Sequence, residues 1–349
     1  MVNFAFITVF AGLLLSLLFW GFKTLPSERW QMIASVPLVK RADGSWVGLN
    51  LTYYGFFSAT GNTLGVALMT LLMASIGMPI SLVVAFIAAV VALAVPASRL
   101  VAAIVEHKRN TFTIAGAAFV STLLLPPLIL GMQHVLRTRL HIEVYLLPVL
   151  AGSGIAYAIG ESIGRLACIS FGCCYGKPLR QARPILARLF QQHHLVFHGH
   201  TKKAAYASGL AGEPLIPVQA ITSLVLALAG LTGVAFFLAQ MWRAAALLPI
   251  VVTWGWRFVS ESLRADFRGG GRTSSYQIMS LVALVYSLVF ISILSADGPV
   301  PNLLAGFPHV ISVPLIAGLQ AFWIALFLFY GRSRVTTSTV AFHVLADQT

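Results

Sequence analysis

The chain has 349 residues, of which 58% are apolar, and its mean hydropathy is +0.87. A water-soluble protein of this length cannot bury so much apolar surface, so the composition excludes a soluble globular fold. The formal net charge is +13, although only 9% of the residues are charged. Because the arginines flank apolar runs, we expect an anionic membrane surface as partner, and no nucleic acid.

Nine apolar runs approach or exceed the length of a helix that crosses a bilayer, which predicts an all-α polytopic membrane protein. The runs are 3–22, 52–74, 79–104, 112–134, 143–163, 217–240, 243–263, 276–296 and 308–330. The first run lacks a basic leader and a cleavage site, so we expect it to remain as a span. In the third run, Pro96 and Arg99 predict a kink and a charged end inside the bundle. Pro126 and Pro127 predict a break in the fourth.

The segments between the runs are predicted to be loops. Residues 23–50 are polar and mixed, and the tail from 331 is short and polar. Residues 165–216 form the long polar region, with seven Lys and Arg against one acid, Glu213. A short amphipathic helix near 181–192 is expected on the membrane surface.

One charged stretch ends the seventh run. Arg257, Glu261 and Arg264 follow one another at i, i+4 and i+7, so they share one face of a helix. Charges at the membrane boundary are costly and usually face an interior cavity. The stretch therefore indicates either a clamp that only ties helices together, or a phosphate site. In a phosphate site an arginine would hold the anion, and Glu261 would orient it or act as a base.

A second charged stretch ends the fifth run, about 90 residues earlier. Arg165 closes this run, and Glu161 lies four residues before it, so the two can pair. The stretch indicates either an arginine at the headgroup level or an anion site in a re-entrant turn. Such a turn is favoured by the surrounding glycines, which are Gly160, Gly164, Gly172 and Gly176.

Three cysteines, Cys168, Cys173 and Cys174, lie within seven residues of one another, shortly after Arg165. They are too few for a disulfide framework, so they are nucleophiles, metal ligands or small residues that pack in the turn. The histidines at 193, 194, 198 and 200 lack matching Cys or acid spacing, so we expect a solvated loop there and no metal.

Together these residues resemble the bacterial prolipoprotein diacylglyceryl transferase family. The resemblance rests on Gly164-Arg165 followed by Gly172 and Gly176, and on the Arg-x-x-x-Glu-x-x-Arg spacing that ends at Arg264. It covers about 50–296. Further agreements are Tyr54-Gly55, Arg99, Pro217 with Gln219, and Gln277 with Ser280.

The chain departs from the family pattern near the reacting bond. Where the family has a His-Gly-Gly element, residues 112–116 contain no histidine. The Asn and Glu positions of the family signature are Cys168 and Cys173, and the Tyr-Glu after the Pro-x-Gln element is Ile221-Thr222. The arginines remain, so the resemblance implies the fold and a phosphate site more directly than it implies the substrate.

The resemblance implies a seven-helix transferase-like core at 51–296, with an added helix in 1–50 and another in 297–349. It implies transfer of a diacylglyceryl group from phosphatidylglycerol, or a similar anionic phospholipid, to a cysteine thiol of a prolipoprotein, with no cofactor. Implied catalytic residues are Arg165, Arg257 and Glu261. Implied substrate-binding residues are Tyr54, Arg99, Gly164, Gly172, Gly176, Gln219, Arg264 and Gln277. Glu261 or Tyr54 would assist removal of the thiol proton.

Two alternatives stay open. One is a lipid-binding or transport protein that keeps the fold without the reaction. The other is a related transferase that uses the cysteines covalently or modifies another acceptor. The resemblance also implies a multi-pass protein of the bacterial inner membrane, with the N-terminus in the cytoplasm and 165–216 outside. The count of basic residues in the loops predicts the reverse orientation.

Overall fold

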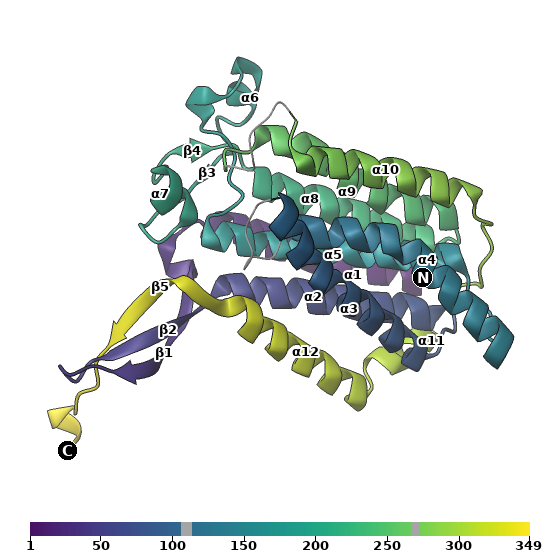
Figure 1. Cartoon of the computed structure of the whole chain (residues 1–349), viewed down its shortest axis with the longest axis horizontal. Helices are drawn as coiled ribbons and strands as arrows, with labels where there is room; N and C mark the ends of the chain where they lie inside the picture. Colours follow the sequence, from purple (N-terminus) through teal and green to yellow (C-terminus); the bar gives the residue numbers. More distant parts are fainter. Residues whose placement is uncertain (106–113, 267–272) are drawn as a thin grey trace.

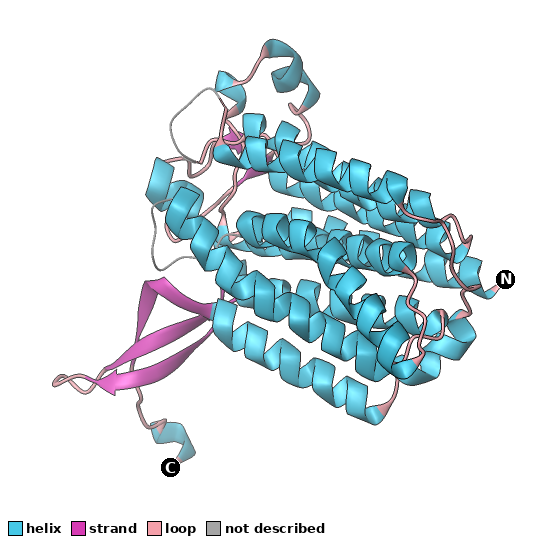
Figure 2. Ribbon diagram, turned by 45° about the vertical axis from the view of Figure 1, so that its right-hand side comes forward, coloured by secondary structure: helices cyan, strands magenta, loops and turns pink. Residues whose placement is uncertain are grey.

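The computed structural model describes residues 1–105, 114–266 and 273–349. It is an all-α polytopic membrane protein, built around a bundle of long helices (Figures 1 and 2). The long helices are α1 (Val2–Thr24), α2 (Tyr53–Ser75), α3 (Ile80–Val105), α4 (Ile114–Leu140), α5 (Leu146–Phe171), α8 (Val218–Leu238), α9 (Trp242–Leu263), α10 (Ser275–Ile293) and α12 (Val313–Gly331). Each predicted run overlaps one of them.

Among the described residues, eight of these helices are long and apolar enough to cross a membrane. The ninth, α9, carries Arg243, Arg257 and Glu261 and packs against α5, α8 and α10. A short helix, α11 (Leu303–Val310), precedes α12. The ninth predicted run, 308–330, therefore includes the end of α11 and all but the last residue of α12.

Glycines bring α2 and α5 into close contact at the centre of the bundle. A Cβ atom on Gly61 would lie 2.4 Å from the carbonyl oxygen of Gly160, and one on Gly160 would lie 2.9 Å from that of Gly61. Small residues let helix backbones approach in this way inside membranes. Because α2 and α5 are antiparallel, the contact places the start of α2, with Tyr54, beside the end of α5, with Arg165.

Several local predictions were wrong. The break predicted at Pro126 and Pro127 is absent, because α4 continues through both prolines, and neighbouring helices can support a proline inside a span. The α3 helix also contains Pro96 without ending there, which leaves the predicted kink untested. Arg99 is exposed and does not point into the bundle. The α5 helix continues six residues beyond Arg165 and ends at Gly172, whose φ of 72° gives a left-handed cap. Arg165 therefore lies inside a helix and not in a re-entrant turn.

The predicted loop 23–50 and the predicted polar tail instead form a sheet. Its strands are β1 (Met32–Lys40), β2 (Trp46–Thr52) and β5 (Arg332–Val340), antiparallel in the order β1-β2-β5. The sheet projects beyond the helices at one end of the bundle (Figure 1). Strand β1 accommodates Pro37 because it is an edge strand, and its pairing with β2 shifts register next to this residue.

The polar region after α5 forms a small cap at the same end of the bundle (Figure 1). Its elements are α6 (Pro184–Leu189), β3 (Leu195–Val196), α7 (Lys203–Ser208) and β4 (Pro214–Leu215). The predicted amphipathic helix corresponds to α6, with only six residues. Lys202 fastens the cap to the bundle: its buried Nζ donates to the carbonyl oxygens of Leu25 at 3.0 Å and Ser170 at 2.5 Å. The N-terminus lies at the opposite end.

Candidate functional site

The two charged stretches, far apart in the sequence, are joined by backbone hydrogen bonds. The N–H of Lys177 donates to Leu263 at 3.0 Å, and the N–H of Ala265 donates to Tyr175 at 3.0 Å. Between them, Gly176 pairs with Arg264 as an isolated antiparallel bridge. A turn after α5 thus holds the end of α9, and brings Arg264 next to the cysteines.

A cavity of about 670 Å³ lies under this turn, between α2, α3, α4, α5, α8, α9, α10 and α12. Its charged residues lie toward the turn, whereas Met69, Phe86 and Leu150 line an apolar region deeper in the bundle. Leu150 and Arg165 are separated by 15 residues of α5, or roughly 22 Å at 1.5 Å per residue. The cavity has a charged end and a long apolar region, which is the polarity of a phospholipid.

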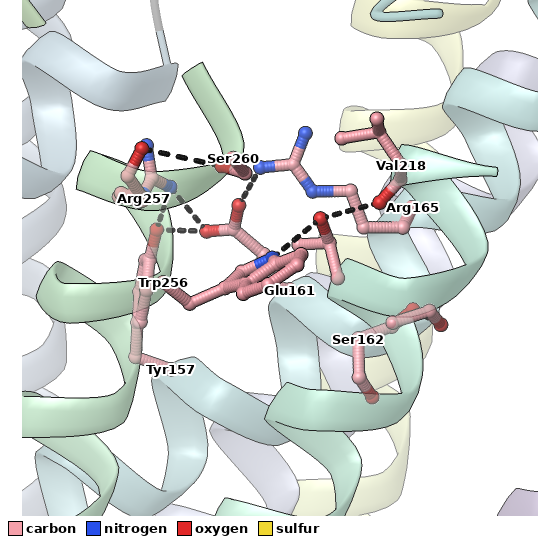
Figure 3. A network of polar contacts seen from close by, with 10 residues as sticks. Tyr157, Glu161, Ser162, Arg165, Val218, Trp256, Arg257 and Ser260 are labelled. Carbon is pink, nitrogen blue, oxygen red and sulfur yellow. Dashed lines mark hydrogen bonds and ion pairs between the residues drawn. The ribbon is translucent and has the colours of Figure 1, made fainter. Parts of the chain in front are cut away.

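Glu161 is the hub of the polar network at the charged end (Figure 3). Its side chain is 6% exposed and forms ion pairs with Arg165, one turn later on α5, and with Arg257 on α9 at 2.5 Å. The hydroxyl of Tyr157 donates to Glu161 and accepts from Arg257. The Arg257 guanidinium also lies 5.6 Å from the centre of the Trp254 ring, a cation–π contact. The carboxylate therefore fixes both guanidinium groups.

The two arginines still have N–H groups to offer a ligand. Among the described residues, the Nε atoms of Arg165 and Arg257 are buried without a hydrogen-bond partner. Burying a donor without a partner costs about 1–3 kcal/mol, so both atoms favour an acceptor in the cavity. Arg264 differs, because Asp266 holds its guanidinium in a bidentate pair with distances of 2.8 and 2.7 Å.

The charges that line the cavity leave one positive charge unbalanced. Within the described part of the chain, the lining includes four cations and three carboxylates. They are Arg165, Lys203, Arg257 and Arg264, with Glu161, Glu261 and Asp266. A single excess positive charge in a site of low dielectric constant favours a monoanionic ligand, and a phosphodiester carries one negative charge.

The sequence profile of the prolipoprotein diacylglyceryl transferase family matches residues 45–293. The chain belongs to this family. It is a multi-pass membrane protein of a transferase family in lipoprotein biosynthesis. No curated protein matched the chain.

Most residues that the family resemblance singled out line the cavity. They are Tyr54, Gly164, Arg165, Cys168, Cys173, Cys174, Gln219, Arg257, Glu261 and Arg264. Gln219 is almost fully buried: its amide N–H donates to the carbonyl oxygen of Cys173 at 2.8 Å, and its Oε1 has no partner among the described residues. Tyr54 packs edge-on against Phe171 at 5.7 Å.

Four predicted substrate-binding residues do not line the cavity. Arg99 is exposed, although its neighbour Ser98 lines the cavity. Gly172 caps α5, and Gly176 allows close approach, since a Cβ atom there would lie 2.3 Å from the carbonyl oxygen of Ile216. Gln277 closes a capping box with the N-terminus of α10. None of these four residues lines the cavity, and Gly172, Gly176 and Gln277 instead shape the backbone of the turn and of the start of α10.

Sequence reasoning identified Glu161 only as a partner of Arg165, and that ion pair is confirmed. It missed the second partner: a clamp within the Arg257 stretch would pair this arginine with Glu261, four residues later, whereas Arg257 forms an ion pair with Glu161. Tyr157 and Asp266 were not singled out. The signal for Tyr157 was its spacing, because Tyr157, Glu161 and Arg165 lie at i, i+4 and i+8 on one helix face. Residues 112 and 113, in the stretch that lacks the family histidine, lie outside the described residues.

Proposed function

We propose that the protein transfers a diacylglyceryl group from phosphatidylglycerol to the thiol of a lipobox cysteine in a prolipoprotein, and that glycerol phosphate leaves. Family membership supports the type of reaction. The observation that carries the proposal for the donor is Arg165, whose buried Nε has no hydrogen-bond partner among the described residues and which lies at the charged end of a cavity with a long apolar region. Diacylglycerol chains would occupy the apolar region, and the headgroup would lie under the turn.

In this proposal Arg165 and Arg264 bind the lipid phosphate. Both line the cavity with Cys174, and the backbone of Arg264 pairs with Gly176, two residues after Cys174, so both arginines lie beside the turn. The Nε of Arg165 offers a donor that no described residue uses. Glu161 and Arg257 would hold Arg165 in position, the role that the sequence assigned to Arg257 and Glu261.

The chemistry is displacement at carbon. The acceptor sulfur attacks the glycerol carbon that bears the phosphate ester, and the C–O bond breaks with its electron pair moving to the phosphate oxygen. Negative charge grows on that oxygen, and fixed guanidinium groups in a site that excludes water stabilise it as it develops. The acceptor thiol must lose its proton before or during the attack.

The proposal places the protein in the bacterial inner membrane, with the cap and the sheet outside the cytoplasm. Excess Lys and Arg on that side predicts the reverse orientation, but arginines kept for phosphate binding confound the count. Arg165, Arg257 and Arg264 all line the cavity and therefore carry little information about insertion.

The test is transfer of labelled diacylglyceryl from phosphatidylglycerol to a lipobox peptide by the purified protein. Arg165→Lys keeps the charge but loses the planar fork, so transfer should fall by about 10²-fold or more. Arg188→Lys, on the exposed surface of α6, is the matched control and should keep full activity.

Full transfer by Arg165→Lys would refute the phosphate site. Lipid binding by the wild-type protein without any transfer would instead favour the lipid-binding alternative. Transfer to a peptide whose only nucleophile is an amine would identify another acceptor.

A further inference from the structure

Three thiols meet at the charged end of the cavity. The Sγ atoms of Cys168, Cys173 and Cys174 all lie within 4.8 Å of one another, and all three residues line the cavity. Cys168 lies in the last turn of α5, and the other two follow its glycine cap. The cluster therefore combines the end of a rigid helix with a turn that is fastened to α8 and α9.

The turn adopts an unfavourable conformation next to this cluster. Cys174 has a φ of 56°, in the left-handed region that side chains other than glycine rarely adopt. Such a residue costs on the order of 1–3 kcal/mol and persists where the surroundings require it. Packing alone would be satisfied by glycine, which already occupies the neighbouring left-handed position, Gly172.

We propose that Cys168, Cys173 and Cys174 bind one zinc ion whose fourth coordination position opens to the cavity and receives the acceptor thiol. This inference rests on the proposed function. In tetrahedral zinc–thiolate sites the Zn–S distance is about 2.3 Å, which sets the sulfur atoms about 3.8 Å apart. A cluster already confined within 4.8 Å needs only small side-chain movements to reach that geometry. The family resemblance predicted no metal, so this is a departure from it.

The ligand set and its charges favour zinc. Thiolates select thiophilic ions such as zinc and copper(I), and three of them leave an open position of the kind found in catalytic zinc sites. Three thiolates and Zn²⁺ carry a net charge of −1, which balances the single excess positive charge of the cavity. Arg165 and Arg264 line the cavity with the three cysteines, and Arg264 pairs with Gly176, two residues after Cys174, so cations already lie beside the proposed ion. With the ion bound, hydrogen bonds from the arginines, and not a net charge of the cavity, would hold the lipid phosphate.

Zinc would activate the acceptor thiol in a chain that lacks the family histidine. A thiol that coordinates zinc is deprotonated, so the acceptor becomes a nucleophile without a base in the cavity, and its proton passes to solvent. Its sulfur then forms the bond to the glycerol carbon, and the C–O electron pair leaves with the phosphate. The thioether product is a neutral and weaker ligand, so it dissociates from the ion.

The chemistry of attack at the glycerol carbon argues against a covalent role for the three cysteines. If one of them attacked the glycerol carbon, it would form a thioether and not a thioester. A second thiol would then have to break a carbon–sulfur bond whose leaving group is a thiolate without activation. The lipid would stay on the protein, so the cysteines serve the reaction as ligands and not as carriers.

The first test is metal content. The purified protein should contain one zinc ion per chain, and Cys168→Ser and Cys174→Ser should lose it, while Arg188→Lys keeps it. Zinc should protect all three thiols of the wild-type protein from an alkylating reagent until a chelator is added, a result that does not require the variants to fold. Metal-free protein with three reactive thiols, or copper(I) in place of zinc, would overturn the assignment.

The second test uses cobalt(II) in place of zinc. Its sulfur-to-metal charge-transfer band should rise by roughly a third when a lipobox peptide is added, because three thiolates become four. A peptide with Ser for Cys should leave the band unchanged. An unchanged band with the Cys peptide would overturn the acceptor role. Transfer that does not depend on zinc would overturn the inference but keep the proposed function. A band that responds to the peptide without any transfer would keep the zinc site but overturn the proposed function.

Discussion

Replacing Glu161 with glutamine tests the hub of the polar network. The substitution keeps the size of the side chain but removes the negative charge that Arg165 and Arg257 share. The three side chains are 6%, 15% and 12% exposed, so water screens them little. Removing one partner of a buried ion pair leaves an uncompensated charge, at a cost of about 3–5 kcal/mol.

The matched control is Glu213→Gln, the same change in an exposed pair. Glu213 lies 3.3 Å from Arg180, and their side chains are 35% and 63% exposed. Exposed ion pairs contribute about 0–1 kcal/mol, so this variant should unfold like the wild-type protein. The difference between the two variants isolates burial, because the chemical change is identical.

The assay is unfolding in mixed micelles, followed by tryptophan fluorescence. Glu161→Gln should lower the free energy of unfolding by at least 2 kcal/mol more than Glu213→Gln, given the costs of roughly 3–5 and 0–1 kcal/mol. In the Arg257→Gln background, Glu161→Gln should cost less, because one of the two stranded charges is already gone. Equal effects of Glu161→Gln and Glu213→Gln would refute the view that Glu161 holds the two arginines.

Three further predictions concern the turn, the cap and the orientation. Gly176→Ala should destabilise the protein, because the added Cβ atom would lie 2.3 Å from the carbonyl oxygen of Ile216. Gly164→Ala is the control and should leave stability unchanged, since nothing lies within 4 Å of its Cβ position. Thermal unfolding compares the two variants, and equal stability would contradict the close approach at Gly176. Burial lowers the pKa of Lys202 from 10.5 to about 7. Between these pH values Lys202 is protonated in the unfolded chain and neutral in the folded protein, so stability should rise with pH by up to about 1.4 kcal/mol per pH unit. Lys202→Met should flatten this dependence. An unchanged slope in the variant would be evidence against the lowered pKa of Lys202. In intact cells, an impermeant thiol reagent should label His198→Cys in the cap but not Asp297→Cys at the other end of the bundle. The reverse pattern would show that the cap faces the cytoplasm.

The helices and the charged stretches were predictable because hydrophobic length is a local signal. A run of about 20 apolar residues specifies a span whatever lies beside it. The sheet was not predictable in this way. Strands β1 and β2 contain Pro37 and Gly48, and β5, which pairs with β2, lies some 280 residues further along the chain. Strand pairing over such a distance leaves no trace in local periodicity.

The choice between Glu161 and Glu261 shows the limit of spacing arguments. Both acids lie four residues from an arginine, so each satisfies the i, i+4 rule equally well. Which acid joins Arg257 depends on how α9 packs on α5, and that packing depends on glycines and small residues spread over several helices. The prediction that Arg99 lies inside the bundle failed for the same reason, because the sequence does not say which face of α3 turns inward.

One face of α5 carries the groups to which we assign roles in the proposed reaction. Tyr157, Glu161, Arg165 and Cys168 lie at i, i+4, i+8 and i+11, which spans about 16 Å along the helix. The lipid phosphate is expected at Arg165, between the buried acid that fixes this arginine and the thiols that approach from the turn. A donor that enters from the membrane and an acceptor that arrives from the cap would therefore meet at one level of the same helix. The continuation of α5 beyond Arg165, which the sequence did not predict, makes this alignment possible, because a turn starting at Arg165 would not hold Cys168 at a fixed position relative to the phosphate.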